Sequence, residues 1–257
     1  MSCKIDRGAI VSPNASLGVD VIVEPFAIIK DNVSIGDRSK VGAHTIIDHS
    51  KIGNDVVIGS FSCIGGDAQV VNIADINSSV IIEDGVIIRE HVVIHRSMID
   101  GGITKIGSNS FIMSQTHIGH DCKLGREIIL SSLAGLGGHV VIDDYAVIGA
   151  NALFHQHTRV GMLAMVAGGA LISRDVIPFF LISHVGKPVS INSVGLRRHN
   201  YSSADITNIK RAYKVLVKSK LPLPDAVTKI KSLLDSNGPI KSMLDFLQGS
   251  KRTYLIG

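Results

Sequence analysis

The sequence predicts a β-solenoid followed by a short helical region. From Ile106 to Ile172 an aliphatic or aromatic residue occupies every sixth position, a period that neither the α-helix nor the extended strand has. Glycine often follows the periodic residue, as expected at the tight corners of a stack of short strands. Near the C-terminus the hexad gives way to helical spacing. We therefore expect a solenoid domain over residues 1–190 and a helical domain over residues 191–257.

The repeat begins close to the N-terminus. Apolar residues recur every six positions from Ile5 onward, and after one slip near residue 50 the phase continues through Val70 and Ile76. Two segments, 65–79 and 100–102, lack the regular pattern of small residues. We expect loops to leave the coil there, because loops that interrupt a solenoid commonly carry binding groups.

The C-terminal region reads as a solenoid end followed by three helices. Pro178 predicts the end of the regular repeat, because proline lacks the amide hydrogen that a ladder needs. Ser202 or Ser203 can cap a first helix, Pro224 suits the start of a second, and residues 237–239 separate a third. One face of the first helix is expected to carry Ile206, Ile209, Tyr213, Leu216 and Val217.

Composition narrows the class of protein. The 257 residues are 45% hydrophobic but only 4% aromatic, with no tryptophan, which suits the narrow interior of a solenoid. The three cysteines have no CxxC spacing, so we expect reduced thiols. The sequence has no signal-peptide pattern and no apolar run as long as a membrane span, and we expect a cytoplasmic protein.

Charge is distributed unevenly. From Asn192 to the end there are 12 Lys and Arg residues and 4 Asp residues, whereas the rest of the chain is mildly acidic. This excess favours an acidic partner at the C-terminal end, although a merely solvated helical surface remains the alternative.

Stacking brings distant histidines together. If three hexads make one coil, residues 18 apart lie about one strand spacing, roughly 4.8 Å, above one another. His120 then stacks on Gly138, and His139 stacks on His157. We expect the candidate site at this patch.

Several motifs carry a specific resemblance that extends over essentially the whole chain. The sequence resembles the UDP-N-acetylglucosamine O-acyltransferases of lipid A biosynthesis. The segments that carry the resemblance are His117-Ile118-Gly119-His120-Asp121-Cys122, Gly137-Gly138-His139, His155-Gln156, Asn192-Ser193-Val194-Gly195-Leu196-Arg197-Arg198 and the basic tail.

The resemblance implies a homotrimer of left-handed parallel β-helices with active sites between subunits. It also implies transfer of an R-3-hydroxyacyl chain from acyl carrier protein to the 3-hydroxyl of UDP-N-acetylglucosamine, without a cofactor, a metal or nucleic acid. Gly168 matches the position that measures acyl length, and a glycine there leaves room for a long chain. The substrate-binding residues implied are Gln69, His117, His139, His155, Gln156, Gly168, Asn192 and Arg198.

The chemistry of such a transfer agrees with the residues. An alcohol needs a base to become a good nucleophile near pH 7, and His120 meets that need. Asp121 can orient the imidazole, and the Gly138 N–H can stabilise the oxyanion. No serine or cysteine lies in a recognisable nucleophile motif, so we expect direct transfer, with Cys122 as a small solenoid residue.

Departures from the family pattern concern the acceptor side. Val70, Asn72, Val194 and His199 replace residues that are usual in the family. A sugar with a 3-amino group, or acetyl-CoA as donor, therefore remains an alternative. A solenoid lyase of the γ-carbonic anhydrase type, with zinc held by histidines, is the rival from another class.

Overall fold

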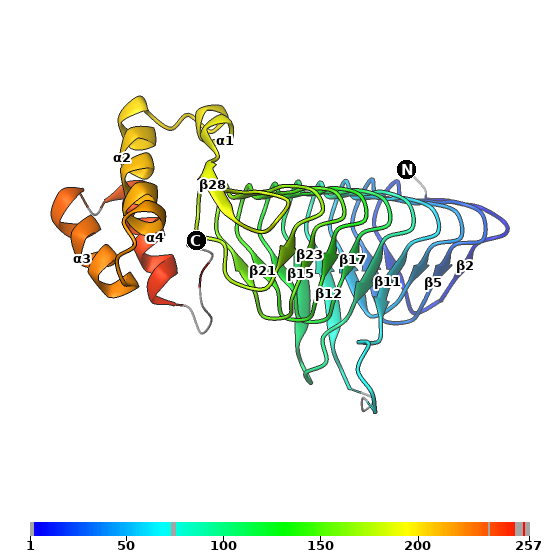
Figure 1. Cartoon of the computed structure of the whole chain (residues 1–257). Helices are drawn as coiled ribbons and strands as arrows, with labels where there is room; N and C mark the ends of the chain where they lie inside the picture. The colour runs from blue at the N-terminus through cyan, green and yellow to red at the C-terminus, as the bar shows by residue number, and fades with distance from the viewer. Residues whose placement is uncertain (1–2, 73–75, 236, 250–253, 255–257) are drawn as a thin grey trace.

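A computed structural model of the chain describes residues 3–72, 76–235, 237–249 and 254. Short parallel strands wind into the predicted left-handed parallel β-helix, and the helices lie beyond its last coil (Figure 1). The predicted fold class is therefore confirmed.

Three sheets form the faces of the solenoid. The first sheet has 11 strands: β1 (Lys4–Ile5), β4 (Ile22–Val23), β7 (Lys40–Val41), β10 (Val57–Ile58), β13 (Ile87–Ile88), β16 (Phe111–Ile112), β19 (Ile129–Leu130), β22 (Val147–Ile148), β25 (Met165–Val166), β27 (Phe180–Ile182) and β28 (Pro188–Ile191). The second sheet has 9: β2 (Ile10–Val11), β5 (Ile28–Ile29), β8 (Ile46–Ile47), β11 (Cys63–Gly66), β14 (Val93–His95), β17 (His117–Ile118), β20 (Gly135–Leu136), β23 (Leu153–Phe154) and β26 (Leu171–Ile172). The third sheet has 8: β3 (Ser16–Leu17), β6 (Val33–Ile35), β9 (Ser50–Ile52), β12 (Ser79–Ile82), β15 (Ile103–Ile106), β18 (Lys123–Leu124), β21 (Val141–Ile142) and β24 (Arg159–Val160).

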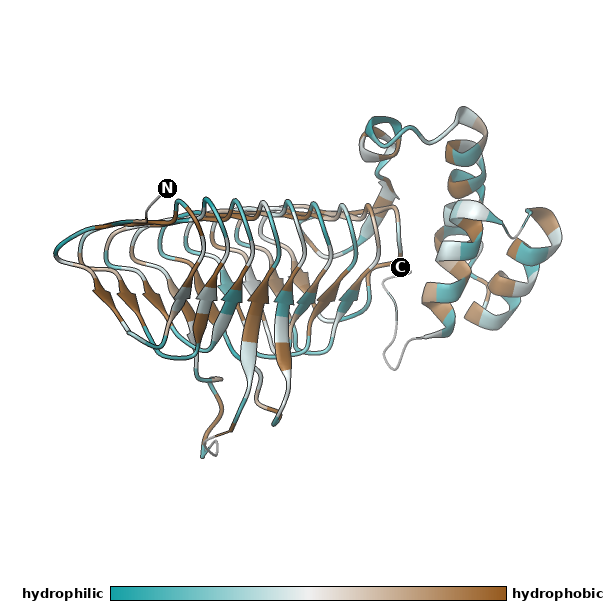
Figure 2. Ribbon diagram, turned by 180° about the vertical axis from the view of Figure 1, so that it is seen from behind, coloured by the Kyte–Doolittle hydropathy of each residue, from teal (hydrophilic) through white to brown (hydrophobic). Residues whose placement is uncertain are grey.

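The hexad residues form the core. Ile118 pairs with Leu136 and Leu136 with Phe154, so residues 18 apart stack as expected. All three side chains are buried. Hydrophobic residues mark the strands along the length of the solenoid, and hydrophilic residues are more frequent in the bends (Figure 2). Each coil therefore buries its apolar side chains against the coils before and after it.

Both expected loops leave the coil, and they project from the same edge of the solenoid (Figure 1). Ile64 pairs with Ile94, 30 positions later, so 12 residues beyond the ordinary coil of 18 lie in the first loop. Ile94 pairs with Ile118, 24 positions later, so the second loop adds 6. The assignment of Val70 and Ile76 to the repeat was wrong. Both lie in the first loop and are only half-buried.

The end of the solenoid also differs from the prediction. The first sheet continues past Pro178, because β27 pairs with β25 in parallel and β28 returns antiparallel to it. The hydrogen bonds of this extension come from residues after the proline, which leaves its missing donor harmless.

The C-terminal helices are α1 (Ser193–Arg198), α2 (Ser203–Tyr213), the π-helical turn η1 (Lys214–Lys218), α3 (Leu223–Leu233) and α4 (Gly238–Gln248). Ser202 caps α2 through a capping box with Asp205. The expected first helix changes to π geometry after Tyr213, but Ile209, Tyr213 and Leu216 are still buried. None of the helices in the described part of the chain combines the length and the hydropathy needed to span a bilayer.

Candidate active site

The candidate site lies at the corner between the second and third sheets. β17, β20 and β23 each end at this corner and are followed by His120-Asp121, Gly138-His139 and Gln156-His157 on successive coils. His139 N–H donates to the His120 carbonyl and His157 N–H to the Gly138 carbonyl, each over 2.9 Å. The predicted stacking is confirmed, and it presents the side chains of three coils in one column.

His120 and Asp121 form a hydrogen-bonded dyad. Asp121 Oδ2 lies 2.8 Å from His120 Nδ1, so the carboxylate accepts the Nδ1 proton and leaves Nε2 as the basic nitrogen. The Nε2 edge of the ring lies directly over Gly138: a Cβ on that glycine would fall 2.5 Å from Nε2 and 2.4 Å from Cε1. Only glycine accommodates the ring in this position.

Asp121 is held from several sides. It is 8% exposed, and it accepts hydrogen bonds from the Ser97 hydroxyl at Oδ1 and from the Met98 N–H at Oδ2, the latter over 3.1 Å. Its own N–H donates to Thr104 Oγ1 over 2.8 Å. Burial alone would raise the pKa of Asp121, but the hydrogen bonds from Ser97, His120 and Met98 outweigh it and lower the pKa. The carboxylate is therefore ionised at neutral pH.

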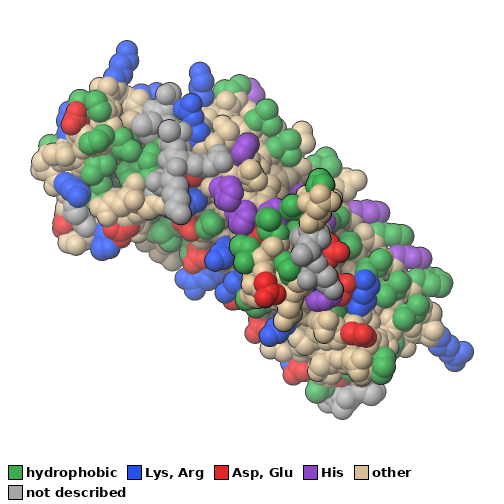
Figure 3. All heavy atoms as spheres, turned by 90° about the horizontal axis from the view of Figure 1, so that it is seen from below, with side chains coloured by type: hydrophobic (Ala, Val, Ile, Leu, Met, Phe, Trp, Pro, Cys, Tyr) green, Lys and Arg blue, Asp and Glu red, His purple; other side chains and the backbone are tan. Residues whose placement is uncertain are grey.

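Further histidines surround the dyad. His139 Nε2 is 3.8 Å from Asp121 Oδ2, and its ring stacks on that of His157 with 4.4 Å between centroids. His117 lies 5.2 Å from His95, centroid to centroid. Burial is the main cause that lowers the pKa of both His117 and His139, so both are neutral near pH 7. Histidine side chains gather near the middle of the face in Figure 3.

The remaining predicted residues are dispersed over one chain. His155 and Gln156 lie exposed at the same corner as the dyad, and Gln69 lies exposed in the first loop. Gly168 follows β25 and is exposed at a different corner, between the first and second sheets. The structure therefore brings His120, Asp121, Gly138 and His139 together, with His117 on the strand that ends at the same corner, and it does not bring Gly168 to them.

The two predicted residues of the C-terminal region lie elsewhere again. Asn192 is buried, and its side chain makes hydrogen bonds within the chain. Its Oδ1 accepts from Gly195 N–H at the start of α1, and its Nδ2 donates to the Leu163 carbonyl, both over 2.9 Å. Arg198 is exposed in the last turn of α1. Within one subunit, α1 therefore packs beside the Leu163 corner, between the third and first sheets.

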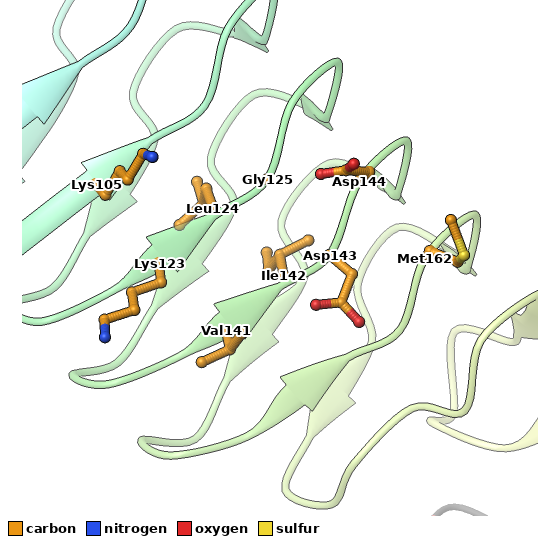
Figure 4. Close-up of a pocket in the computed structure, with 9 residues that line it drawn as sticks. All are labelled: Lys105, Lys123, Leu124, Gly125, Val141, Ile142, Asp143, Asp144 and Met162. Atoms are coloured by element: carbon orange, nitrogen blue, oxygen red, sulfur yellow. The ribbon is translucent and has the colours of Figure 1, made fainter. Parts of the chain in front are cut away.

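A shallow pocket of about 420 Å³ lies on the third sheet (Figure 4). Its charges come from Lys105, Lys123, Asp143 and Asp144, and part of its apolar floor from Val141 and Ile142. None of the predicted site residues lines it. This pocket on a single chain therefore does not locate the candidate site, which is identified by the hydrogen-bonded histidines at the corner between the second and third sheets.

Two other chemistries can be judged from the geometry. Among the described residues, His120, Asp121 and His139 could hold a metal ion, since their ligand atoms lie within 4.8 Å of one another. Asp121 is, however, already engaged by three donors. Cys122 is buried, and burial raises the pKa of its thiol to about 12, so it is the predicted small solenoid residue and no nucleophile.

Sequence reasoning missed His95, Ser97 and Thr104, which contact or adjoin the site residues. Ser97 and the Met98 N–H belong to the second loop, which was expected from its glycines. The polar Asp100 at a repeat position was the available signal, but it gave no indication of which side chain would reach Asp121.

Comparisons with known proteins place this geometry in a family. A curated acyl-[acyl-carrier-protein]–UDP-N-acetylglucosamine O-acyltransferase from Thermodesulfovibrio yellowstonii is 39% identical over 252 residues, which cover 97% of this chain and 98% of that protein. The chain belongs to the UDP-N-acetylglucosamine O-acyltransferase family. It is therefore an acyltransferase.

Other UDP-N-acetylglucosamine O-acyltransferases agree with this placement. The family model for domain 2 of these enzymes matches residues 175–255. A relative from Syntrophobacter fumaroxidans is 38% identical over 97% of this chain and 98% of its own length. The crystal structure of the enzyme from Francisella novicida superimposes with a TM-score of 0.94 and 36% identity, covering 98% of this chain and 93% of that one.

Proposed function

We propose that this chain transfers an R-3-hydroxyacyl group from acyl carrier protein to the 3-hydroxyl of UDP-N-acetylglucosamine, the first step of lipid A biosynthesis. The observation that carries the proposal is the dyad of His120 and Asp121 placed against Gly138, since this arrangement supplies a base and an oxyanion donor in one corner.

His120 Nε2 removes the proton of the sugar hydroxyl as its oxygen attacks the thioester carbonyl. Asp121 holds Nδ1–H and stabilises the imidazolium that forms. The Gly138 N–H, on the coil beside the ring, stabilises the tetrahedral oxyanion. Collapse expels the carrier-protein thiolate, and the imidazolium returns the proton to it. No covalent acyl-enzyme forms.

The substrate contacts and the trimer belong to the same proposal. Gly168, Asn192 and Arg198 lie at corners away from His120 in one chain, so they reach a substrate there only from a neighbouring copy. An exposed column of stacked rings, Phe26, His44, Phe61 and His91, offers the kind of surface a partner covers; Phe26 is 59% exposed. We infer a homotrimer in the cytoplasm. His117, His139, His155, Gln156 and Gln69 complete the substrate site.

The direct test measures acylation of labelled UDP-N-acetylglucosamine by carrier proteins that bear 3-hydroxyacyl chains of several lengths. Acetyl-CoA is tested as a competing donor and a 3-amino sugar nucleotide as a competing acceptor. His120→Ala should lower kcat by at least about 10², the usual share of general acid–base catalysis. Near-normal turnover in a folded His120→Ala protein would refute the mechanism. Unchanged mass and melting temperature are the control for folding.

Metal analysis tests the rival chemistry. Stoichiometric zinc in the purified protein, together with a lyase activity that chelation removes, would favour a zinc site at His120, Asp121 and His139. Full transferase activity in metal-free protein supports the acyl transfer proposed above.

A further inference from the structure

One short segment, His95–Met98 at the end of β14, contacts both the first loop and the catalytic dyad. All of its first three residues are buried: His95 is 8% exposed, Arg96 6% and Ser97 0%. Neither the hexad nor the family motifs above include these side chains. Their partners indicate what they do.

Arg96 holds the first loop at both ends. Its Nε and Nη2 donate to Asp67 Oδ1 over 2.9 and 2.7 Å, and its Nη1 donates to the Ile76 carbonyl over 2.5 Å. Its backbone N–H donates to the Gly66 carbonyl over 2.9 Å, and His95 Nδ1 donates to the Asp67 carbonyl over 2.5 Å. A buried guanidinium thus brackets the segment that carries Gln69.

Ser97 and Met98 hold the dyad. The Ser97 hydroxyl donates to Asp121 Oδ1 and itself accepts the Ile99 N–H over 2.9 Å, which fixes the direction of its proton. Met98 N–H donates to Asp121 Oδ2, the same oxygen that accepts from His120 Nδ1. The Ser97 carbonyl accepts from the Ser78 hydroxyl over 2.7 Å, which ties the same segment to the returning end of the first loop.

We propose that His95–Met98 is a positioning element that sets the first loop, which carries Gln69, relative to the general base His120, with Arg96 fixing the loop and Ser97 fixing Asp121. The inference rests on the proposed function. Neither side chain touches the reacting atoms. Arg96 acts on the acceptor through the loop with Gln69, and Ser97 acts on proton transfer through Asp121 and His120. Loss of each should therefore affect a different kinetic constant.

The test uses Arg96→Gln and Ser97→Ala in the full-length protein. Arg96→Gln should raise the acceptor KM about tenfold or more, because a hydrogen-bonded charge pair is lost, while kcat changes little. Its effect should not multiply with that of Gln69→Ala, since both act through one loop. Ser97→Ala should lower kcat about tenfold or more with the acceptor KM kept within about twofold, because a charge-assisted hydrogen bond to Asp121 is lost.

Two control variants remove a buried serine hydroxyl and a solvent-exposed Arg–Asp pair elsewhere in the solenoid. Ser110→Ala deletes a buried hydroxyl that donates to the Gly107 carbonyl over 2.8 Å, and Arg38→Gln deletes an Arg–Asp pair with Asp55 at another corner. Both controls should keep kcat and KM near wild type. Equal kinetic losses in the controls and the test variants would show a general effect on stability and overturn the proposal.

Two measurements are independent of turnover. Amide exchange of residues 67–72 should become faster in Arg96→Gln only, and the ¹⁵N signals of the His120 ring should show loss of the single Nδ1–H tautomer in Ser97→Ala only. If wild-type protein fails to acylate UDP-N-acetylglucosamine, the proposed function is wrong, and these two readouts still decide the positioning role. Unchanged exchange and an unchanged tautomer would overturn it.

Discussion

Gly138→Ala isolates the contact between the general base and the coil beneath it. The substitution adds one methyl group at a position whose backbone is outside the left-handed region, so alanine is tolerated by the main chain. The added Cβ would meet His120 Cε1 at 2.4 Å and Nε2 at 2.5 Å. Ordinary contact begins at 3.4 Å. The imidazole must therefore move by about 1 Å.

A displacement of that size is large for a base that has to face the sugar hydroxyl. Misplacement of a catalytic group by about 1 Å can cost about 10² in rate, or ~2.7 kcal/mol of transition-state stabilisation. The ring can move only by straining its 2.8 Å hydrogen bond to Asp121. We expect kcat to fall by about 10² while the melting temperature changes little.

Initial rates with saturating acceptor and donor provide the measurement. Gly8→Ala is the control, because its Cβ would meet the Phe26 ring at 3.3 Å and Asp6 Oδ1 at 3.5 Å, without the severe overlap found at Gly138. Adding Gly138→Ala to His120→Ala should cause little further loss, since the two changes act on one group. If Gly138→Ala kept kcat within about threefold of wild type, the placement of His120 against Gly138 would be irrelevant to catalysis and this reasoning would fail.

Three further predictions concern charge, pH and assembly. Replacing the exposed Lys210, Arg211 and Lys214 by Glu should raise the KM for acyl carrier protein, weaken the salt dependence of that KM and leave the acceptor KM nearly unchanged. An unchanged donor KM at low salt would mean that the carrier protein docks elsewhere. Because burial lowers the pKa of His117 and His139 in the folded chain, the unfolded chain binds protons more readily, so the melting temperature should fall as the pH drops below about 6.5, and less so in His117→Gln/His139→Gln; equal pH dependence would contradict this. Sedimentation should give about 82 kDa, three chains of 27.3 kDa each, and a stable monomer with full activity would exclude the shared site.

Periodicity alone was enough to predict the scaffold and the central contact of the site. His120 stacks on Gly138 because the coils after Ile106 have no insertions, so the 18-residue count holds there. The same periodicity misplaced Val70 and Ile76. The loops of 12 and 6 residues are multiples of the hexad, so the apolar phase runs through them although the chain has left the coil.

The environment of Asp121 could not be predicted in this way. Its bonds to Ser97 and Met98 join residues 24 and 23 positions apart through a loop that interrupts the coil. No repeat specifies such a contact, because the conformation of the loop depends on its own hydrogen bonds. Contacts within the regular coils could be predicted from the 18-residue repeat, whereas contacts made through the loops could not.

The first loop leaves the coil after β11 and returns at β12, and the third sheet resumes its register with Ile82 opposite Ile52. The number of residues between departure and return does not set which side chains of later coils face inward. A descendant of this sequence can therefore change the length of the segment that carries Gln69 without changing the register that places His120 over Gly138. Such an architecture lets the choice of acceptor diverge while the machinery of proton transfer is inherited unchanged.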